Sequence, residues 1–271
     1  MPVGKIVSFI LLIVMALAAV LPLYWMVCTA FQRPSLTMEF PPEWIPANPT
    51  LDNMRRFLGR PYIWTWTLNS AVVAGTVTLL HVFLAALAGY TFAKKEFIGD
   101  QFLFWLYVGS MMVPAQVTLI PLYLLMSKLC FLDTYAGLIA PGIAGPFGVF
   151  LMKQQISTLP SELLDAAKID GCSEWALFQR IVLPLAKPGL AVLGIFTFVG
   201  QWNAFLWPLI ITRSSTMRTL QVGLTLIQEE VPMQFAVLMA GATFAAIPML
   251  TVFLIFQRYF LEGVTVGALK G

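Results

Sequence analysis

Charged residues are scarce in this sequence of 271 residues: Asp, Glu, Lys and Arg together make up 11% of it, whereas apolar residues make up 59%. A soluble domain carries roughly 25% charged residues. A water-soluble fold of this length could not bury so much apolar surface, so the composition indicates a protein whose solvent is the lipid bilayer. The formal net charge of +3 is too small to indicate a nucleic-acid partner.

Histidine and cysteine are also rare, with one His and three Cys in the chain. The cysteines, Cys28, Cys130 and Cys172, share no close spacing, and a single His leaves no zinc or haem motif. We interpret them as three free thiols packed as small hydrophobes. The phosphate-binding pattern G-x-x-x-x-G-K-[ST] does not occur, so we expect this chain to bind no metal and no cofactor of its own.

Six segments are long and apolar enough to cross a bilayer, whose core of about 30 Å needs about 20 residues of helix. They are residues 6–31, 67–92, 102–126, 134–152, 189–211 and 235–257. The first is longer than the core of a cleaved signal peptide and is interpreted as an uncleaved span. The sequence therefore predicts an all-α membrane protein: one domain over residues 1–271 with six transmembrane helices.

No Asp, Glu, Lys or Arg lies inside any of the six segments. Ion-coupled transporters keep such charges because they use them, as do membrane enzymes with acid–base chemistry. Both classes are therefore disfavoured alternatives, and a secondary transporter is also expected to carry an internal inverted repeat, which we do not see. His81 has no intramembrane carboxylate as a partner, so we interpret it as a neutral, hydrogen-bonded helix histidine.

Charge concentrates in residues 153–188, between the fourth and fifth predicted spans. Pro160 suits a first helical turn, and Glu162 favours the positive end of a helix dipole. Asp170-Gly171 predicts the end of this helix, because Gly can adopt the left-handed cap conformation.

A second short helix is predicted to follow. Ser173 can cap its start, and Trp175, Phe178 and Val182 form an apolar stripe at helical spacing. Pro184 is expected to end it. Two such helices suit a groove in a partner protein, or they fold back on their own bundle; the residues alone leave both readings open.

The same segment contains the pattern D-A-A-x-x-D-G at residues 165–171, followed by I-x-L-P at residues 181–184. This pattern resembles the EAA loop of ABC importer permeases. It departs from the family at Asp165, where Glu is usual, so the charge is kept on a side chain one methylene shorter. Further stretches resemble the carbohydrate subgroup and its maltose-type "G" subunit, so the resemblance covers essentially the whole chain: they include Trp202-Asn203-x-Phe205 and the tail Gly263-x-Thr265-x-Gly267.

The resemblance implies a non-catalytic permease subunit of an ATP-driven, binding-protein-dependent sugar importer in the bacterial cytoplasmic (inner) membrane. The implied partners are a second homologous permease subunit, an ATPase dimer that carries ATP and Mg, an extracytoplasmic solute-binding protein and a carbohydrate substrate. Residues 153–188 would form a cytoplasmic coupling loop, and both termini would be cytoplasmic. The distribution of Lys and Arg between the loops leaves this orientation open.

The resemblance also implies roles for particular residues. Those expected to couple to the ATPase are Glu162, Asp165, Ala166, Ala167, Asp170, Gly171, Ile181, Leu183 and Pro184. Those resembling the loop that contacts the binding protein are Thr219, Leu220 and Gln221. Trp202 and Asn203 are candidate sugar contacts, because aromatic faces and amides suit hydroxylated rings. An interfacial tryptophan and a helix–helix hydrogen bond explain these two residues at least as well.

Overall fold

The structure is a computed structural model that describes residues 3–33, 43–230 and 235–268. Within these ranges every regular element is a helix, which confirms the predicted all-α class. The elements in chain order are α1 (Val3–Ala30), α2 (Asp52–Leu58), α3 (Ile63–Lys94), α4 (Asp100–Gly109), η1 (Ser110–Met112), α5 (Ala115–Lys128), α6 (Tyr135–Ile139), η2 (Ala140–Gly142), α7 (Pro146–Ser157), α8 (Ser161–Ile169), α9 (Glu174–Leu177), η3 (Phe178–Val182), α10 (Leu183–Leu185), α11 (Lys187–Trp202), α12 (Leu206–Ile211), α13 (Leu220–Glu230) and α14 (Phe235–Ala268).

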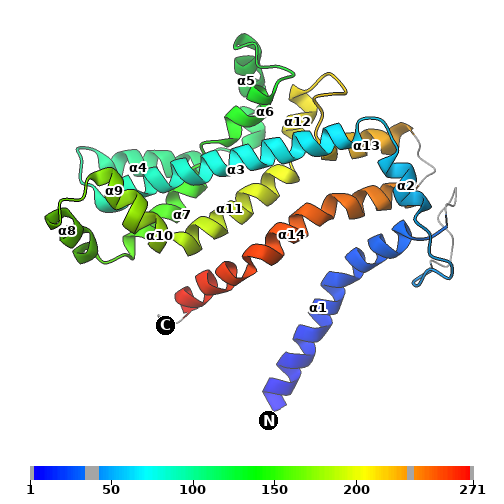
Figure 1. Ribbon diagram of the computed structural model, residues 1–271, viewed down its shortest axis with the longest axis horizontal. Helices are drawn as coiled ribbons and strands as arrows, with labels where there is room; N and C mark the ends of the chain where they lie inside the picture. The colour runs from blue at the N-terminus through cyan, green and yellow to red at the C-terminus, as the bar shows by residue number, and fades with distance from the viewer. Residues whose placement is uncertain (1–2, 34–42, 231–234, 269–271) are drawn as a thin grey trace. The chain divides into compact units, whose positions relative to one another are not determined.

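Three of the predicted spans are single long helices in the described ranges. The apolar stretches are Gly4–Ala30 in α1, Ile63–Lys94 in α3 and Phe235–Gln257 in α14. At a rise of about 1.5 Å per residue, each exceeds the roughly 30 Å needed to cross the hydrocarbon core. Figure 1 shows α1, α3 and α14 as continuous ribbons.

The other three predicted spans are interrupted. Helices α4 and η1 meet α5 at 101°, and α6 and η2 meet α7 at 44°. A third bend of 77° separates Glu174–Leu185 from α11. The described residues therefore contain three helices that could cross a membrane, or up to six spans if each bent pair is counted as one.

Proline explains the first two bends. Val113 is extended, with a ψ of 115°, because the following Pro114 disfavours the helical conformation before it. At the second bend, Pro141 lies in η2, and Gly145 is extended before Pro146 opens α7. Residues 102–126 and 134–152 were each predicted to form one transmembrane helix, and in the structure each is bent.

The predicted span 189–211 is also divided. Helix α11 ends at Trp202, with Asn203 as its C-cap, and α12 begins at Leu206. Pro208 gives the reason: in a continuous helix its ring would clash with the carbonyl of Ala204, and it has no N–H to donate there.

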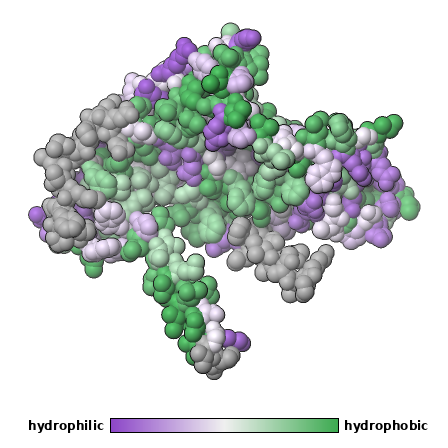
Figure 2. Space-filling view, turned by 180° about the vertical axis from the view of Figure 1, so that it is seen from behind, coloured by the Kyte–Doolittle hydropathy of each residue, from purple (hydrophilic) through white to green (hydrophobic). Residues whose placement is uncertain are grey.

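The chain forms two compact units, which we describe separately. Unit 1 consists of Met1–Trp66 and Leu220–Pro248. In it, the side-chain amide of Asn53 donates to the carbonyls of Ala30 at 3.2 Å and Gln32 at 2.8 Å, and so ties α2 to the end of α1. Most α1 side chains are exposed and apolar, and Figure 2 shows this helix green along most of its length. This is the surface expected of a helix in contact with lipid.

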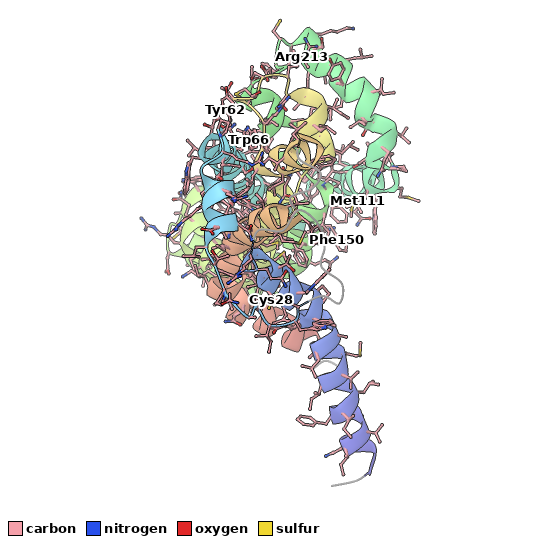
Figure 3. The ribbon with its side chains drawn as sticks, turned by 90° about the vertical axis from the view of Figure 1, so that its right-hand side faces the viewer. Cys28, Tyr62, Trp66, Met111, Phe150 and Arg213 are labelled. Carbon is pink, nitrogen blue, oxygen red and sulfur yellow. The ribbon has the colours of Figure 1, made fainter. Side chains whose placement is uncertain are left out.

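Unit 1 also contains a close aromatic contact at the start of α3. The rings of Tyr62 and Trp66 stack with centroids 6.2 Å apart (Figure 3). Gly223 of α13 lies against the same indole, and a Cβ at this position would come within 2.0 Å of the Trp66 ring. A small residue at position 223 therefore lets α13 approach α3 closely.

Unit 2 consists of Thr67–Thr219 and Met249–Gly271. Its largest buried apolar cluster joins the second half of α3 to α7, α8, α9, η3 and α11. Met152, Ile156, Leu177 and Val182 are fully buried in it. The segment between α7 and α11 is thus packed onto the membrane helices, as one of the two readings of the sequence expected.

Candidate functional site

The segment between α7 and α11 begins with α8, whose ends match the prediction from sequence. The helix starts directly after an extended Pro160, and Glu162 occupies its first turn, where negative charge is favoured. At the other end Gly171 adopts a φ of +81°, and the N–H of Cys172 donates to the carbonyl of Ala167 at 3.0 Å. This hydrogen bond and the left-handed Gly171 together form a Schellman motif, in which the left-handed residue is usually glycine.

The two faces of α8 have different surroundings. Leu164 and Ala167 are buried in the apolar cluster of unit 2. The opposite face, which includes Asp165 and Ala166, is exposed, and at its end the Ile169 side chain is 87% exposed.

The nine residues that were expected to couple to an ATPase differ in their exposure to solvent. Ala167 is buried, and Ile181 and Leu183 are half-buried. The other six are exposed: Glu162, Asp165, Ala166, Asp170, Gly171 and Pro184. All the exposed members except Pro184 belong to α8 and its C-terminal cap. The Asp165 carboxylate accepts a hydrogen bond from Lys168 at 3.3 Å on the same exposed turn.

The second helix begins as predicted and ends later than predicted. The hydroxyl of Ser173 accepts a hydrogen bond from the N–H of Ala176 at 3.3 Å and caps α9. The helix then passes through the π-helical Phe178–Val182 and ends at Leu185, one residue beyond the Pro184 that was expected to end it. Pro184 lies in the first turn of α10, where the missing N–H is tolerated.

An ion pair attaches the start of α9 to the end of α3. Nζ of Lys95 lies 2.5 Å from Oε2 of Glu174, and the hydroxyl of Tyr90 donates to the same oxygen at 3.0 Å. The hydrogen bond from Lys95 lowers the pKa of Glu174 below its usual range. Partial burial acts to lower the pKa of Lys95, but the hydrogen bonds and charges of Glu174 and Tyr90 together outweigh it, so that the pKa is raised.

The preceding lysine attaches the start of α8 to the same helix end. Nζ of Lys94 donates to the carbonyl of Leu159 at 2.6 Å and to the hydroxyl of Ser161 at 3.3 Å. Neither attachment was predicted from the sequence. The adjacent lysines at the end of a predicted span were a visible signal, but their partners lie 65 to 79 residues away, beyond any local pattern.

The candidate sugar contacts differ in exposure. The Trp202 side chain is only 2% exposed and stacks on Phe198 with ring centroids 5.9 Å apart. Asn203 is exposed, and its amide donates to the sulfur of Met249 at 3.1 Å. The packing interpretation thus describes Trp202, while Asn203 stays a prediction as a substrate contact.

The residues expected to contact a binding protein lie at the start of α13. Thr219 is 4% exposed and Leu220 is fully buried, whereas Gln221 is half-buried. Part of the predicted outer segment, residues 231–234, lies outside the described residues. The exposed stretch nearest to Thr219 is the turn that precedes it, residues 213–218.

Polar side chains from elsewhere in unit 2 hold this turn in place. The Asp133 carboxylate accepts hydrogen bonds from the backbone N–H groups of Arg213 at 2.9 Å and Ser214 at 3.1 Å. Partial burial acts to raise the pKa of Asp133, and these hydrogen bonds outweigh it, so that the pKa is lowered. The amide of Asn69 donates to the carbonyls of Thr216 at 2.7 Å and Arg218 at 2.9 Å.

His81 is surrounded by small or uncharged groups. Its Nε2 lies 3.3 Å from the carbonyl of Gly145, and its Nδ1 lies 3.3 Å from the hydroxyl of Thr197. The ring occupies space left by two glycines, since a Cβ on Gly148 would come within 2.3 Å of Nε2. This arrangement fits the interpretation of a hydrogen-bonded helix histidine.

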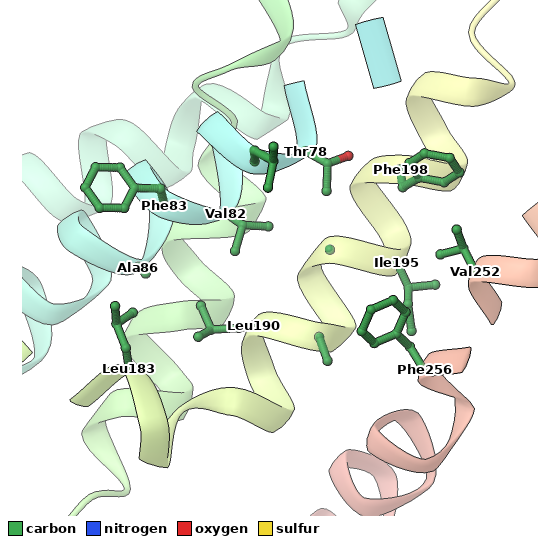
Figure 4. Close-up of a pocket in the computed structure, with 13 residues that line it drawn as sticks. Thr78, Val82, Phe83, Ala86, Leu183, Leu190, Ile195, Phe198, Val252 and Phe256 are labelled. Atoms are coloured by element: carbon green, nitrogen blue, oxygen red, sulfur yellow. The ribbon is translucent and has the colours of Figure 1, made fainter. Parts of the chain in front are cut away.

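A cavity of about 410 Å³ lies between α3, α10, α11 and α14 within unit 2 (Figure 4). Figure 4 shows Val82, Phe83, Leu190 and Phe256 around it, and Thr78 carries the one polar side chain of the lining. Sugar hydroxyls would find few partners there. Neither candidate sugar contact lines this cavity.

Comparisons with known proteins connect this geometry to a family. Residues 81–266 match the family described as binding-protein-dependent transport system inner membrane component. The chain is 37% identical over 263 residues to the arabinooligosaccharides transport system permease protein of Halalkalibacterium halodurans, covering 94% of this chain and 93% of that protein. It is 40% identical over 215 residues to the arabinooligosaccharides transport system permease protein of Bacillus subtilis, covering 79% and 76%.

The fold is similar to that of a solved structure. A chain in the crystal structure of a bacterial ABC transporter involved in the import of the acidic polysaccharide alginate matches with a TM-score of 0.83 at 21% identity, covering 95% of this chain and 96% of that one. At this identity the match shows the fold. Together with the family match over 81–266, it establishes that the chain belongs to the inner-membrane permease components of binding-protein-dependent transport systems.

Proposed function

We propose that this permease is one of two homologous membrane subunits of an ATP-driven importer for a carbohydrate, and that it forms half of the translocation pathway. The carbohydrate class is supported by two relatives, which are permease proteins of arabinooligosaccharide transport systems. An extracytoplasmic solute-binding protein delivers the sugar, and a cytoplasmic ATPase dimer binds ATP and Mg and hydrolyses the ATP. The chain itself carries no phosphate-binding G-x-x-x-x-G-K-[ST] pattern.

The exposed face of α8 carries the proposal. Its buried side, Leu164 and Ala167, fixes it to unit 2, and the opposite side presents Asp165, Ala166 and Ile169 outward. A small side chain at 166 lets the helix backbone approach the wall of a groove, and Ile169 offers apolar surface to bury there. The same residues carry the resemblance to the EAA loop, so α8 is the coupling helix in this proposal.

The attachments of α8 explain how it can act as a lever. Its own apolar face and the bonds from Lys94 and Lys95 join it to the helices of unit 2. A displacement of α8 by a closing ATPase dimer is therefore passed to those helices rather than absorbed by a loose loop. The chain contributes binding and movement, and the ATPase contributes the free energy.

Purification of the assembly from its native membrane tests the proposal. A second permease and an ATPase should co-purify with this chain, and vesicles holding the complex should take up sugar only with binding protein outside and ATP inside. Sugar uptake in vesicles without ATP would establish the alternative, a secondary transporter. Recovery of the chain alone or as a homo-oligomer would also contradict the proposal.

The proposed orientation places the α8 segment and both termini in the cytoplasm. Two native thiols report on it, since Cys130 is exposed beyond α5 and Cys172 follows α8. In single-cysteine variants, a membrane-impermeant maleimide should label Cys130 in intact cells and Cys172 only after the membrane is opened. The reverse pattern would invert the orientation.

A further inference from the structure

Helix α3 is the unbroken element that passes through unit 2. Asn69 near its start and Lys94 at its end are 25 residues apart, or about 38 Å at a rise of 1.5 Å per residue. That length exceeds the roughly 30 Å of the hydrocarbon core. The helices that precede and follow α8 in the chain, α7 and Glu174–Leu185, each belong to a bent pair.

The end of α3 is attached to both sides of the coupling helix. Lys94 bonds the segment that leads into α8, and Lys95 bonds Glu174 just after it. Tyr90 packs its ring on Phe178 with centroids 5.7 Å apart and donates to Glu174. A movement of α8 therefore acts on the end of α3 through several contacts at once.

The start of α3 is attached to the turn at residues 213–218. Asn69 is 2% exposed, and its amide donates both of its hydrogens to backbone carbonyls of that turn, those of Thr216 and Arg218. Its Oδ1 accepts a hydrogen bond from the hydroxyl of Tyr135 at 2.5 Å. Each polar atom of this buried amide thus has a partner, and replacing the amide leaves two partly buried carbonyls without their donor.

We propose that α3 is a connecting rod that carries the movement of the coupling helix to the turn at residues 213–218, and that Asn69 is the positioning residue at the far end. This inference rests on the proposed function, in which α8 meets the ATPase in the cytoplasm, and it adds that the turn lies on the opposite face, where the binding protein docks. A helix transmits a push along its axis because consecutive hydrogen bonds fix its length. Coupling of this kind is reciprocal, so docking at the turn also changes the affinity of the ATPase for ATP.

Asn69→Asp tests the inference in the assembled transporter. Aspartate keeps the shape of the side chain and its acceptor for Tyr135, but it removes both donors and places a carboxylate opposite two carbonyl oxygens. Asn48→Asp is the matched control, because it makes the same chemical change at an exposed residue. The complex is held in lipid nanodiscs with its ATPase, second permease and sugar-loaded binding protein.

Amide hydrogen exchange is then measured with and without a non-hydrolysable ATP analogue. In the natural protein and in Asn48→Asp, exchange should change both in α8 and in residues 212–219. In Asn69→Asp the response of α8 should persist and that of residues 212–219 should be lost. The stimulation of ATP hydrolysis by binding protein should fall several-fold in Asn69→Asp alone.

The readouts separate failure of this inference from failure of the proposed function. No nucleotide response in α8 of the natural protein would refute the coupling role itself. A response in α8 with none in residues 212–219, or a full response of residues 212–219 in Asn69→Asp, would refute the role of α3 as a connecting rod and leave the coupling role of α8 in place. If Asn69→Asp does not assemble, Glu174→Ala tests the other end of α3, since the side chain that it removes is 60% exposed. In this variant the nucleotide response of residues 212–219 should weaken relative to that of α8. An unchanged ratio of the two responses would count against the inference.

Discussion

Lys95 and Glu174 meet at 2.5 Å across 79 residues of chain, so that the end of α3 holds the first turn of α9. The pKa values of the two groups are shifted in opposite directions. The Glu174 pKa is lowered on folding, so its contribution to stability is present above the ordinary Glu pKa of about 4.3 and is lost as the pH falls through the folded value. The Lys95 pKa is raised, so its contribution is present below about 10.4 and is lost as the pH rises through the folded value.

We therefore expect the attachment of α9 to be constant near neutral pH and to weaken in acid. A double-mutant cycle with Lys95→Met and Glu174→Gln should give an interaction free energy of about 0.2–1 kcal/mol at pH 7, because the Glu174 side chain is 60% exposed. The measurement is denaturant unfolding in detergent at pH 7 and below pH 4. An interaction energy that stayed the same in acid would show that the ion pair does not hold α9.

Gly171 is expected to be required for coupling because of its backbone conformation. Its φ is +81°, and no atom lies within 4 Å of a Cβ built there. A side chain at this position therefore costs roughly 1–2 kcal/mol of backbone strain and leaves the packing intact. We predict that Gly171→Leu loses most of the co-purifying ATPase and of the sugar uptake, since the strain is relieved by shifting the cap of α8.

Gly99→Leu is the matched control for this change. Gly99 has a φ of +84° and equally open surroundings, but it caps α4 rather than α8. Both variants are measured by ATPase recovery and by uptake in vesicles. Equal losses in the two would mean that backbone strain in general, and not the shape of the coupling helix, is responsible.

Local patterns in the sequence were enough to predict where α8 begins and ends and where α9 begins. Pro160 and Glu162 predicted the start of α8, Asp170-Gly171 predicted its end, and Ser173 predicted the next cap. Each of these acts within four or five residues of itself, so a single sequence carries the information. The resemblance at residues 165–184 depended on the same local pattern; the match over residues 81–266 confirms the family, and the EAA loop stays a prediction.

Longer-range features could not be read in this way. The partners of Asn69 lie 147 and 149 residues away, and no periodicity links them. The bends were missed for a different reason: apolar composition defines the length of a span but not its continuity.

The contact of His81 with Gly148 predicts a strong effect of a single methyl group. A Cβ at position 148 would lie 2.3 Å from Nε2 of His81 and 3.0 Å from Cβ of Ala85, whose backbone cannot yield easily. We expect Gly148→Ala to destabilise the protein by about 1–3 kcal/mol, as overpacking does. The measurement is the midpoint of thermal unfolding of the purified complex.

Two further variants identify the cause of that loss. Gly75→Ala on α3 makes the same change where nothing lies within 4 Å, and it should leave the midpoint unchanged or raise it. His81→Ala combined with Gly148→Ala should recover part of the stability, since the imidazole no longer occupies the space. Without recovery in the double variant, the clash would have to be with Ala85 instead.

Asn203 offers the sharper test of a sugar contact. Trp202 is buried, so its replacement by alanine costs about 3–5 kcal/mol of packing and cannot isolate a role in binding. Asn203 is exposed, and its side-chain amide donates to the sulfur of Met249, a weak acceptor. We predict that Asn203→Ala raises the KM for uptake several-fold while the yield of assembled complex is unchanged. Met249→Leu removes the sulfur and keeps the amide, so it should transport normally; if it instead reproduced the Asn203→Ala defect, the asparagine would act through helix packing and not through the sugar.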